Sequence, residues 1–420
     1  MTDRSETLLG PYRALDLTDE KGFLCGRLLG DLGADVIKIE KPGGDPSRNI
    51  GPFYHDTPDS EKSLYWFAYN TNKRGITLDI ETTDGKELFK RLVKTADWVI
   101  ESFEPGYLEG IDLGYEALNK VNQGIIVASI SPFGQSGPYK DYKGSDLVCT
   151  ALGGYLYLCG DRDRAPVRVG MNQAYLHAGA EAADGAVAAL HYRSMTGEGQ
   201  QVDIAVQHSQ HIQLLAAAPN WDLRGVNEER QGINAKRPGA KFIMPAHYEC
   251  KDGYLYFHFV GGLMGGRSNT ELVKWMESEG FATEFIKSID WFKFDIMAPE
   301  VDQEFVNHII GPISEFFKQY TKKELLEGGA ERHIMLFPLG NMQDNLTSPQ
   351  LAAREFWTQL EHPELADTIT YPGPYIKMSE TPLPIQSRAP LIGEHNEEIF
   401  VDELGLSQKE LIILKQGGII

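Results

Sequence analysis

The first half of the chain alternates short apolar runs with stretches of helical periodicity. The runs that we expect to be strands are residues 14–18, 35–40, 76–80, 97–101 and 124–130. Helical patterns lie between them, one ending at Gly33 and another over residues 85–95. Short apolar strands that alternate with helices predict a parallel sheet with helices on both of its faces.

The helical pattern of residues 179–193, GAEAADGAVAALHYR, is rich in alanine and poor in bulky side chains. We expect this helix to pack closely against another element. The glycines in residues 197–199 end it, and QVDIAV at residues 201–206 is expected to be a further strand.

The pattern changes beyond about residue 220. Residues 224–241 are polar and basic and are expected to form a long loop, and residues 247–259 predict a hairpin. Amphipathic helices follow to about residue 330, so a second, smaller domain is expected at residues 225–335. The C-terminal segment is rich in proline and then helical to about Leu404, with Asn396 as the expected N-cap.

Composition narrows the class of protein. The 420 residues are 42% hydrophobic and 24% charged, which is typical of a folded, soluble protein. The net charge of -20 argues against a nucleic-acid partner, because phosphate-backbone affinity comes mainly from Lys and Arg. A local basic patch for a small phosphorylated ligand stays possible.

Cysteine spacing and the N-terminus indicate the compartment. The four cysteines (Cys25, Cys149, Cys159, Cys250) lie far apart without a CxxC pair, so neither a disulfide framework nor a zinc site is expected. No apolar signal segment and no run of about 18 apolar residues is present, so neither secretion nor membrane insertion is expected. A cytoplasmic protein fits these features.

Generic catalytic motifs are absent. The chain has no GxGxxG after a strand, no GxxxxGK[ST], no HExxH and no GxSxG. A nicotinamide, nucleoside-triphosphate, zinc-protease or serine-hydrolase site is therefore not expected, and no metal site is predicted. These features alone indicate a soluble α/β protein that we expect to be an enzyme.

The order of seven motifs along the chain resembles the class III CoA-transferases, the CaiB/BaiF family. The motifs are ALDLT, LLGDLGADVIKIEKPGGDPSR, YNTNKRGITLDI, ADWVIESFEPGYLEGIDLGYEAL, SISPFGQSGPYKDYKGSD, RSMTGEGQQVDIAV and SRAPLIGEHNEEI. The resemblance implies a doubly wound large α/β domain, built from residues 1–210 and 350–420, and a small central α+β domain at 225–335. It further implies linkers at 211–224 and 336–349, and two chains threaded through each other as interlocked rings.

The family's chemistry uses an aspartate nucleophile that forms an acyl anhydride and then an aspartyl-CoA thioester. In the family pattern this Asp lies four residues before a Gly and eighteen before the Arg of R-x-x-TG. Counting back from Gly179 and from Arg193 gives the same position, and the residue there is Tyr175. A phenol has a pKa of about 10, so it is mostly neutral at pH 7, and it cannot form an anhydride.

Nearby side chains offer no obvious replacement. On a helix starting at Tyr175, Glu181 lies about 240° around the axis, Asp184 about 180° and His177 about 200°. None shares the face of Tyr175, so Glu181 and Asp184 are expected to be solvated helix residues.

The resemblance assigns a CoA site residue by residue. Lys41 and Lys143 keep cations that the family uses for CoA phosphates, and Phe103 keeps an aromatic ring that could flank pantetheine or adenine. Lys73 and Arg74 keep the family's NKR, with phosphate contact as one reading and a role at a strand end as the other. CoA and acyl-CoA are thus expected as substrates, with no permanently bound cofactor.

Several positions depart from the family. Ser102 replaces Asn, Glu104 and Gly110 stand where arginine is common, and Glu81 stands where lysine is common. Fewer cations and more acids predict weaker CoA binding.

The expected entrance of the active site also differs. Lys21, Phe23 and Leu24 stand near the family's Q-x-x-GP, so a bulky apolar pair is expected to narrow the entrance. Racemases of the family need a His where Ser145 stands, and they need the Asp that is lost at Tyr175, which excludes that activity.

The resemblance therefore implies a non-nucleophilic subunit of a heteromeric CoA-transferase. Its partner would be a homologous, Asp-bearing chain. The expected reaction moves CoA from succinyl-CoA to a carboxylic acid such as benzylsuccinate, as in anaerobic toluene degradation. Two alternatives remain: an active homomeric transferase that uses another carboxylate, and a non-enzymatic acyl-CoA binding or scaffold protein.

Overall fold

The computed structural model describes residues 7–235, 240–383 and 385–420. The chain divides into two compact units. The larger comprises residues 1–157, 168–227 and 349–420, and the smaller comprises residues 158–167 and 228–348.

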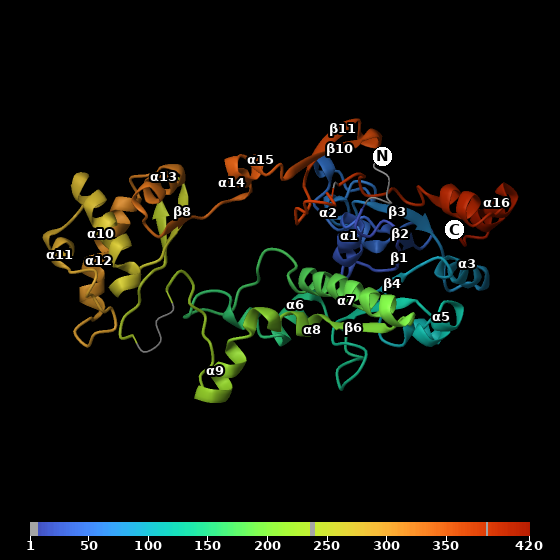
Figure 1. The fold of residues 1–420 in the computed structure, drawn as a ribbon, viewed down its shortest axis with the longest axis horizontal. Helices are drawn as coiled ribbons and strands as arrows, with labels where there is room; N and C mark the ends of the chain where they lie inside the picture. Colours follow the sequence, from blue (N-terminus) through green and yellow to red (C-terminus); the bar gives the residue numbers. More distant parts are fainter. Residues whose placement is uncertain (1–6, 236–239, 384) are drawn as a thin grey trace. The chain divides into compact units, whose positions relative to one another are not determined.

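A six-stranded parallel sheet forms the centre of the larger unit, in the order β3-β2-β1-β4-β5-β6 (Figure 1). Its strands are β1 (Arg13–Asp16), β2 (Asp35–Glu40), β3 (Lys73–Thr77), β4 (Trp98–Glu101), β5 (Ile126–Ser131) and β6 (Gln201–Ala205). The α/β class predicted from the alternating pattern is confirmed.

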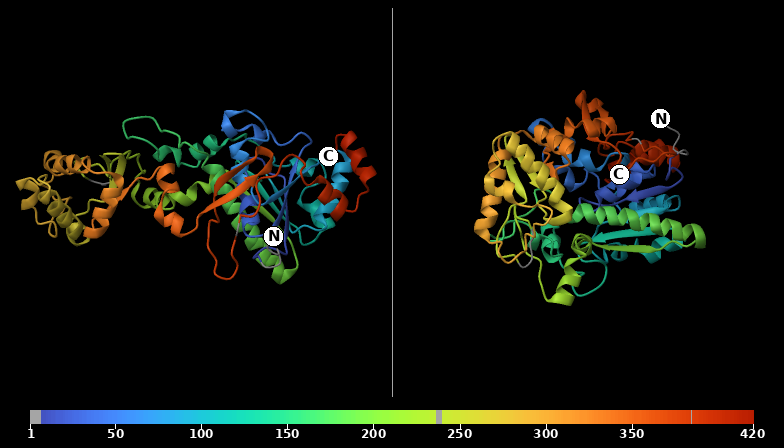
Figure 2. Two further views of the ribbon diagram at one scale, coloured as in Figure 1. Left: turned by 90° about the horizontal axis from the view of Figure 1, so that it is seen from above. Right: turned by 60° about the vertical axis from the view of Figure 1, so that its left-hand side comes forward.

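Helices cover both faces of this sheet because neighbouring strand residues point to opposite sides. Ala14 and Trp98 face a core that includes α1 (Phe23–Asp31) and α7 (Ala174–Thr196). Leu15 and Val99 face a second core on the opposite side of the sheet. The helices of this core include α3 (Thr83–Val93), α5 (Tyr115–Val121) and α16 (Gln408–Gln416). Figure 2 shows the green α7 and the red α16 on opposite sides of the strands.

Strand β3 begins earlier than the apolar run at 76–80 predicted. Its ladder pairs Val36–Glu40 of β2 with Lys73–Thr77. The ladder ends there because the Asp79 amide donates to the Ile419 carbonyl near the C-terminus instead. Leu78 and Ile80 are nevertheless buried, which explains the misleading pattern.

The alanine-rich helix α7 packs closely against α1, as its composition predicted. A Cβ placed on Gly179 would lie 2.9 Å from the Leu24 Cβ atom, so no larger residue fits without a shift. The indole N–H of Trp98 also donates to the Ala186 carbonyl at 3.0 Å. These contacts hold α7 against α1 near Gly179 and against β4 at the middle of the helix.

The C-terminal part of the chain returns to the same unit. It contains an antiparallel hairpin of β10 (Trp357–His362) and β11 (Asp367–Pro372). The expectation that Asn396 caps a helix is wrong, because its carboxamide accepts from the Thr77 amide and donates to the Thr77 hydroxyl. The residues that follow, Glu398–Glu403, form a short π-helix without a side-chain cap.

The smaller unit combines a three-stranded antiparallel sheet with helices. Its strands are β7 (His247–Cys250), β8 (Gly253–Phe257) and β9 (Leu336–Pro338), so the predicted hairpin is present. Its principal helices are α10 (Gly262–Ser278), α11 (Glu284–Ser288), α12 (Gln303–Phe317) and α13 (Lys322–Arg332). Their apolar faces meet the sheet in a separate aromatic core around Phe257, Trp275 and Phe316.

The remaining helices are short. They are α2 (Leu64–Tyr69), α4 (Tyr107–Gly110), α6 (Asp146–Leu152), α8 (Val206–Ser209), α9 (Ala217–Arg224), α14 (Met342–Leu346) and α15 (Pro349–Ala353). Single 3₁₀ turns lie at Pro46–Asn49, Tyr54–Asp56, Leu156–Leu158, His211–Leu214 and Pro363–Leu365.

In the part of the chain that the structure describes, no helix has the length and apolar character needed to cross a membrane. Within the same residues, His, Cys, Asp and Glu side chains form no group of three or more that could hold a metal ion.

Candidate ligand-binding site

The order of the sheet reverses between β1 and β4, and in such folds ligands bind outside the carboxyl ends of the strands at that point. Two cavities lie there. Both are lined by Asp19, which follows β1, and by Ser102 and Phe103, which follow β4. The topology of the sheet thus identifies these cavities as the candidate site independently of any motif.

Cavity A has a volume of about 560 Å³ and extends from the end of β1 towards β2. Its wall includes Glu20, Lys41 and Ser47, together with the aromatic residues Phe103 and Tyr107. The two rings stack with centroids 4.5 Å apart and planes 28° apart. Such a flat aromatic surface can receive a planar or flexible organic group.

Lys41 lies at the rim of cavity A with about 56% of its side chain exposed. Its Nζ pairs with Glu81 Oε1 at 3.1 Å, and the Tyr107 hydroxyl donates to the same oxygen at 2.6 Å. These two partners, the Tyr107 hydrogen bond first, hold the pKa of Glu81 below its usual value. Lys41 is therefore accessible, but a carboxylate already contacts it.

Cavity B has a volume of about 390 Å³ and lies on the β4–β5 side. Three lysines line it: Lys21, Lys140 and Lys143. Lys21 pairs with Asp19, whereas Lys143 makes only a loose pair with Glu104 at 3.7 Å. The structure thus brings Lys41, Phe103, Lys143 and Lys21 to two adjoining cavities.

Lys73 and Arg74 do not reach these cavities. The Lys73 ammonium is buried and donates to Asp16 Oδ2, the Phe23 carbonyl and Asn70 Oδ1, which uses all three of its protons. Arg74 forms a bidentate pair with Asp35 and further pairs with Glu398 and Glu403. Their expected phosphate contact is therefore not supported, because every donor that could make it is already paired.

Phe23 and Leu24 are also placed differently from the expectation. The Phe23 ring is 1% exposed and packs edge-to-face on Trp66, with centroids 5.4 Å apart. Leu24 lies against Gly179 of α7. The prediction that Phe23 narrows the entrance is wrong, because the ring is part of the core. Of this trio, Lys21 lines cavity B, and Phe23 and Leu24 are not in the lining of cavity A or B.

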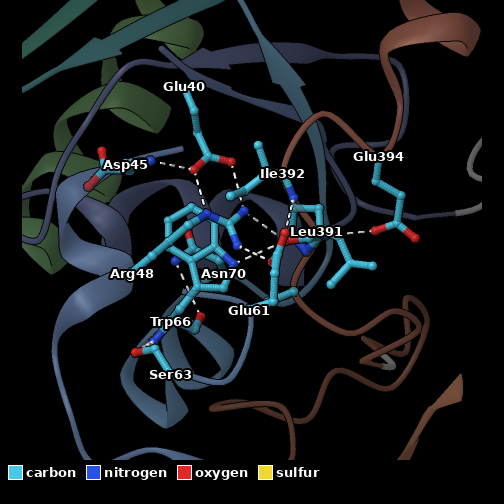
Figure 3. Close-up of polar contacts among 12 residues, drawn as sticks. Glu40, Asp45, Arg48, Glu61, Ser63, Trp66, Asn70, Leu391, Ile392 and Glu394 are labelled. Carbon is cyan, nitrogen blue, oxygen red and sulfur yellow. Dashed lines mark hydrogen bonds and ion pairs between the residues drawn. The ribbon is translucent and has the colours of Figure 1, made fainter. Parts of the chain in front are cut away.

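A buried ionic network supports the wall of cavity A (Figure 3). The Arg48 guanidinium is bidentate to Glu40, at 2.6 and 2.8 Å, and also donates to Glu61 at 2.7 Å. It stacks on Trp66 at 3.8 Å. Arg48 and Trp66 both donate to the Pro390 carbonyl, so the C-terminal SRAPLIGEH motif anchors to the end of β2.

Tyr175 lies in the first turn of α7 and is 6% exposed. Burial raises the pKa of its phenol, and the nearby charges of Glu20, Asp19 and Asp146 raise it further. The hydroxyl therefore stays neutral at physiological pH and is a poor nucleophile.

Asp146 is a buried carboxylate that the sequence analysis did not single out. It is 5% exposed and accepts the Tyr175 amide at 3.1 Å, with further bonds from the amides of Ala174 and Gln173. Burial raises its pKa, and these amides oppose the shift. Its position at the start of a helix in GSD was the available signal, but its distance from α7 in sequence concealed that it also accepts from the first amides of α7.

Two further carboxylates were missed. Glu20 lines cavity A, accepts from the Ser47 hydroxyl at 2.7 Å and is the strongest charge acting on Tyr175. Glu101, at the end of β4, is 5% exposed, and burial raises its pKa to about 7. Glu20 lies two residues after a predicted strand and Glu101 is the last residue of another, and this position at strand ends is the signal that could have identified them.

The other polar residues of α7 face away from Tyr175. Glu181 accepts from the Ser209 hydroxyl at 2.6 Å, His177 pairs with Gln213 at 2.6 Å, and Asp184 is exposed. Since α7 is helical from Ala174, the angular separation expected for these residues applies.

Comparisons with known proteins show the family to which the chain belongs. Residues 13–396 match CoA-transferase family III. The chain is 37% identical over 404 residues to succinyl-CoA:(R)-benzylsuccinate CoA-transferase subunit BbsE of Thauera aromatica, covering 93% of each chain. It is 33% identical to succinyl-CoA–D-citramalate CoA-transferase of Chloroflexus aurantiacus, covering 95% of this chain and 94% of the relative.

A solved structure is similar throughout. The CAIB/BAIF family protein from Brucella suis superposes with a TM-score of 0.80 at 29% identity, covering 94% of this chain and 99% of that protein. The similarity extends over both units of the chain described above.

Proposed function

Because the chain belongs to CoA-transferase family III, we propose that it is the non-nucleophilic subunit of a heteromeric CoA-transferase. The observation that carries this proposal is the buried, neutral Tyr175 at the family's nucleophile position. A phenol cannot replace a carboxylate in chemistry that passes through an anhydride and an acyl thioester. The Asp that performs the reaction would belong to a homologous partner chain, interlocked with this one.

Coenzyme A would bind in cavities A and B. Lys41 and Lys143 are the exposed cations that could contact its phosphates, and Phe103 with Tyr107 offers an aromatic surface. The number of acids nearby supports weak binding: cavity A has Asp19, Glu20, Glu40 and Asp45 in its wall, with Lys41 as the lining cation.

The substrates proposed are succinyl-CoA as donor and an acid such as benzylsuccinate as acceptor, in anaerobic toluene degradation. The support is the name of the BbsE relative alone. In the reaction, the partner's carboxylate attacks the thioester carbonyl and releases CoA thiolate. The thiolate then attacks the aspartyl carbonyl and releases succinate, and the acceptor carboxylate reverses both steps.

A second candidate function is an active homomeric transferase that uses a different carboxylate. Glu20 favours it, because this carboxylate lines cavity A and its charge acts on Tyr175 at the family's nucleophile position. A third candidate, a non-enzymatic acyl-CoA binding protein, would bind CoA without turnover in any complex.

Activity assays separate these functions. The purified chain, free of partner, is assayed with succinyl-CoA and several carboxylate acceptors, and then again after co-expression with an Asp-bearing homologue. The proposal expects turnover only in the mixed complex, and loss of turnover when the partner's nucleophile is replaced by Ala. Steady turnover by this chain alone would overturn it, and loss of that turnover in Glu20→Gln would establish the second function.

A further inference from the structure

The Glu81 carboxylate contacts both a lysine and a tyrosine that line cavity A. Glu81 Oε1 accepts from Lys41 Nζ at 3.1 Å and from the Tyr107 hydroxyl at 2.6 Å. Tyr107 stacks on Phe103, and Lys41, Tyr107 and Phe103 all line the cavity. Glu81 therefore occupies the contact that a ligand phosphate would make with Lys41.

The short bond from Tyr107 holds this carboxylate in place. A hydroxyl that donates to an ionised carboxylate makes one of the stronger hydrogen bonds in proteins. Tyr107 is itself fixed by its stack on Phe103, which sits at the point shared by cavities A and B. Without this bond, Glu81, whose side chain is 46% exposed, would be free to swing into solvent.

A phosphate that binds Lys41 either displaces Glu81 or shares the ammonium with it. The two anions compete for one ammonium group, and leaving both beside it would place like charges together. Displacement also leaves the Tyr107 hydroxyl to find another acceptor. The competition for Lys41 and the loss of the Tyr107 hydrogen bond both weaken the binding of an anionic ligand. Neither effect could be inferred from the number of charged residues around the cavity.

We propose that Glu81 sets the affinity of cavity A for CoA, by holding Lys41 until a ligand phosphate displaces it, with Tyr107 as the positioning residue for its carboxylate. This inference rests on the proposed function only in placing a CoA phosphate at Lys41. Glu104 plays a lesser part at cavity B, because its pair with Lys143 is longer, at 3.7 Å, and both side chains are largely exposed.

The test measures CoA binding to the full chain by calorimetry. Glu81→Gln removes the charge and keeps an oxygen that can accept from Tyr107, so the fold is preserved. Exposed ion pairs are individually weak, so the CoA Kd should fall about threefold to fivefold. Glu87→Gln is the matched control, because Glu87 is an exposed acid that pairs with Lys90 at 3.2 Å and does not line either cavity. Its Kd should not change.

Three further measurements identify the cause of the gain. In a Lys41→Ala background, Glu81→Gln should no longer improve binding. In a Tyr107→Phe background, the improvement should shrink, because Glu81 is then no longer held beside Lys41 by the tyrosine hydroxyl. In about 0.5 M salt the improvement should shrink, since exposed charges are screened beyond a few ångströms.

Three results would overturn the proposal. They are an unchanged or higher Kd in Glu81→Gln, an equal gain in Glu87→Gln, and a gain that survives Lys41→Ala. If the native chain and Glu81→Gln both show no CoA binding, the proposal also fails. A different result, equal CoA affinity of the native chain and Lys41→Ala, would instead refute the placement of CoA at Lys41.

Discussion

The rim of cavity A and the network beside it use cations in opposite ways. Lys41 and Arg48 come from the same motif and lie on either side of Pro42–Asp45. Lys41 is 56% exposed and holds a single partly exposed carboxylate, whereas the Arg48 side chain is 1% exposed and contacts Glu40, Glu61, Pro390 and Trp66. One cation is available to a ligand, and the other belongs to the fold.

The same contrast separates Lys143 from Lys73 and Arg74. All were candidates for CoA phosphates, but only Lys143 has a largely exposed side chain. Arg74 lies at the amino ends of the strands, in a cavity of about 630 Å³ whose cations and carboxylates largely pair with one another. A basic residue in a family motif therefore predicts a ligand contact only if its donors are not already satisfied.

Replacing Arg48 should have the largest effect. Arg48→Met leaves the buried Glu40 carboxylate without a cation, and breaking a buried pair in this way costs about 3–5 kcal/mol of unfolding free energy. Urea unfolding measures it, with Lys41→Met as the control that should change stability by less than about 0.5 kcal/mol. Adding Glu40→Gln should recover part of the loss. If Arg48→Met lowered the free energy of unfolding by less than about 1 kcal/mol, the assignment of Arg48 to the fold and Lys41 to ligand binding would be contradicted.

Glu101 should make stability depend on pH. Burial raises the pKa of Glu101 in the folded chain to about 7, above its value of about 4.3 in an unfolded chain. Its contribution is therefore fully present below about pH 4.3 and is lost as pH rises through 7. Between pH 5 and 8 the native chain should lose up to about 3 kcal/mol relative to Glu101→Gln.

The pH experiment compares thermal unfolding of both chains across that range. Glu87→Gln serves as the control, since Glu87 is exposed and its removal should leave the slope unchanged. Parallel stability curves for the native chain and Glu101→Gln would show that Glu101 is ionised throughout.

Replacing Lys41 should weaken binding without affecting the fold. Lys41→Ala is expected to raise the CoA Kd about tenfold, or about 1.4 kcal/mol, which is modest because Glu81 already competes for the ammonium. Calorimetry measures the Kd, and unchanged thermal unfolding shows that the fold is intact. An equal loss of binding in Lys90→Ala, a half-buried lysine outside both cavities, would indicate a general charge effect instead.

Replacing Lys143 should have the smallest effect. Its side chain is about 88% exposed and its pair with Glu104 is 3.7 Å long, so a bound phosphate would remain well solvated. We expect Lys143→Ala to raise the CoA Kd about threefold. The same titrations measure it, and an effect larger than that of Lys41→Ala would place the principal phosphate at cavity B.

Much of the fold could be predicted from the sequence because the signals were local. All six sheet strands overlap stretches that the sequence predicted as strands, and the small side chains of α7 indicated its close packing. Asn396 was misassigned because its partner, Thr77, lies far away in sequence. Phe23 was misplaced for the same reason, since its burial depends on Trp66.

The candidate site was only partly predictable. Lys41, Phe103 and Lys143 were expected from the family resemblance, and the structure places all three in the lining of cavity A or B. Whether a cation is free to bind a ligand depends on which acceptors lie beside it in the folded chain, and the sequence does not give those neighbours. Lys73 illustrates this, because its acceptors come from Asp16, Phe23 and Asn70.

The location of the covalent intermediate tests the central claim most directly. The mixed complex of this chain and its Asp-bearing partner is incubated with succinyl-CoA, and both chains are examined by intact mass spectrometry. With Tyr175 at the nucleophile position, this chain should keep its mass, and the partner alone should gain the CoA thioester. A CoA adduct on any carboxylate of this chain, Glu20 in particular, would contradict the account.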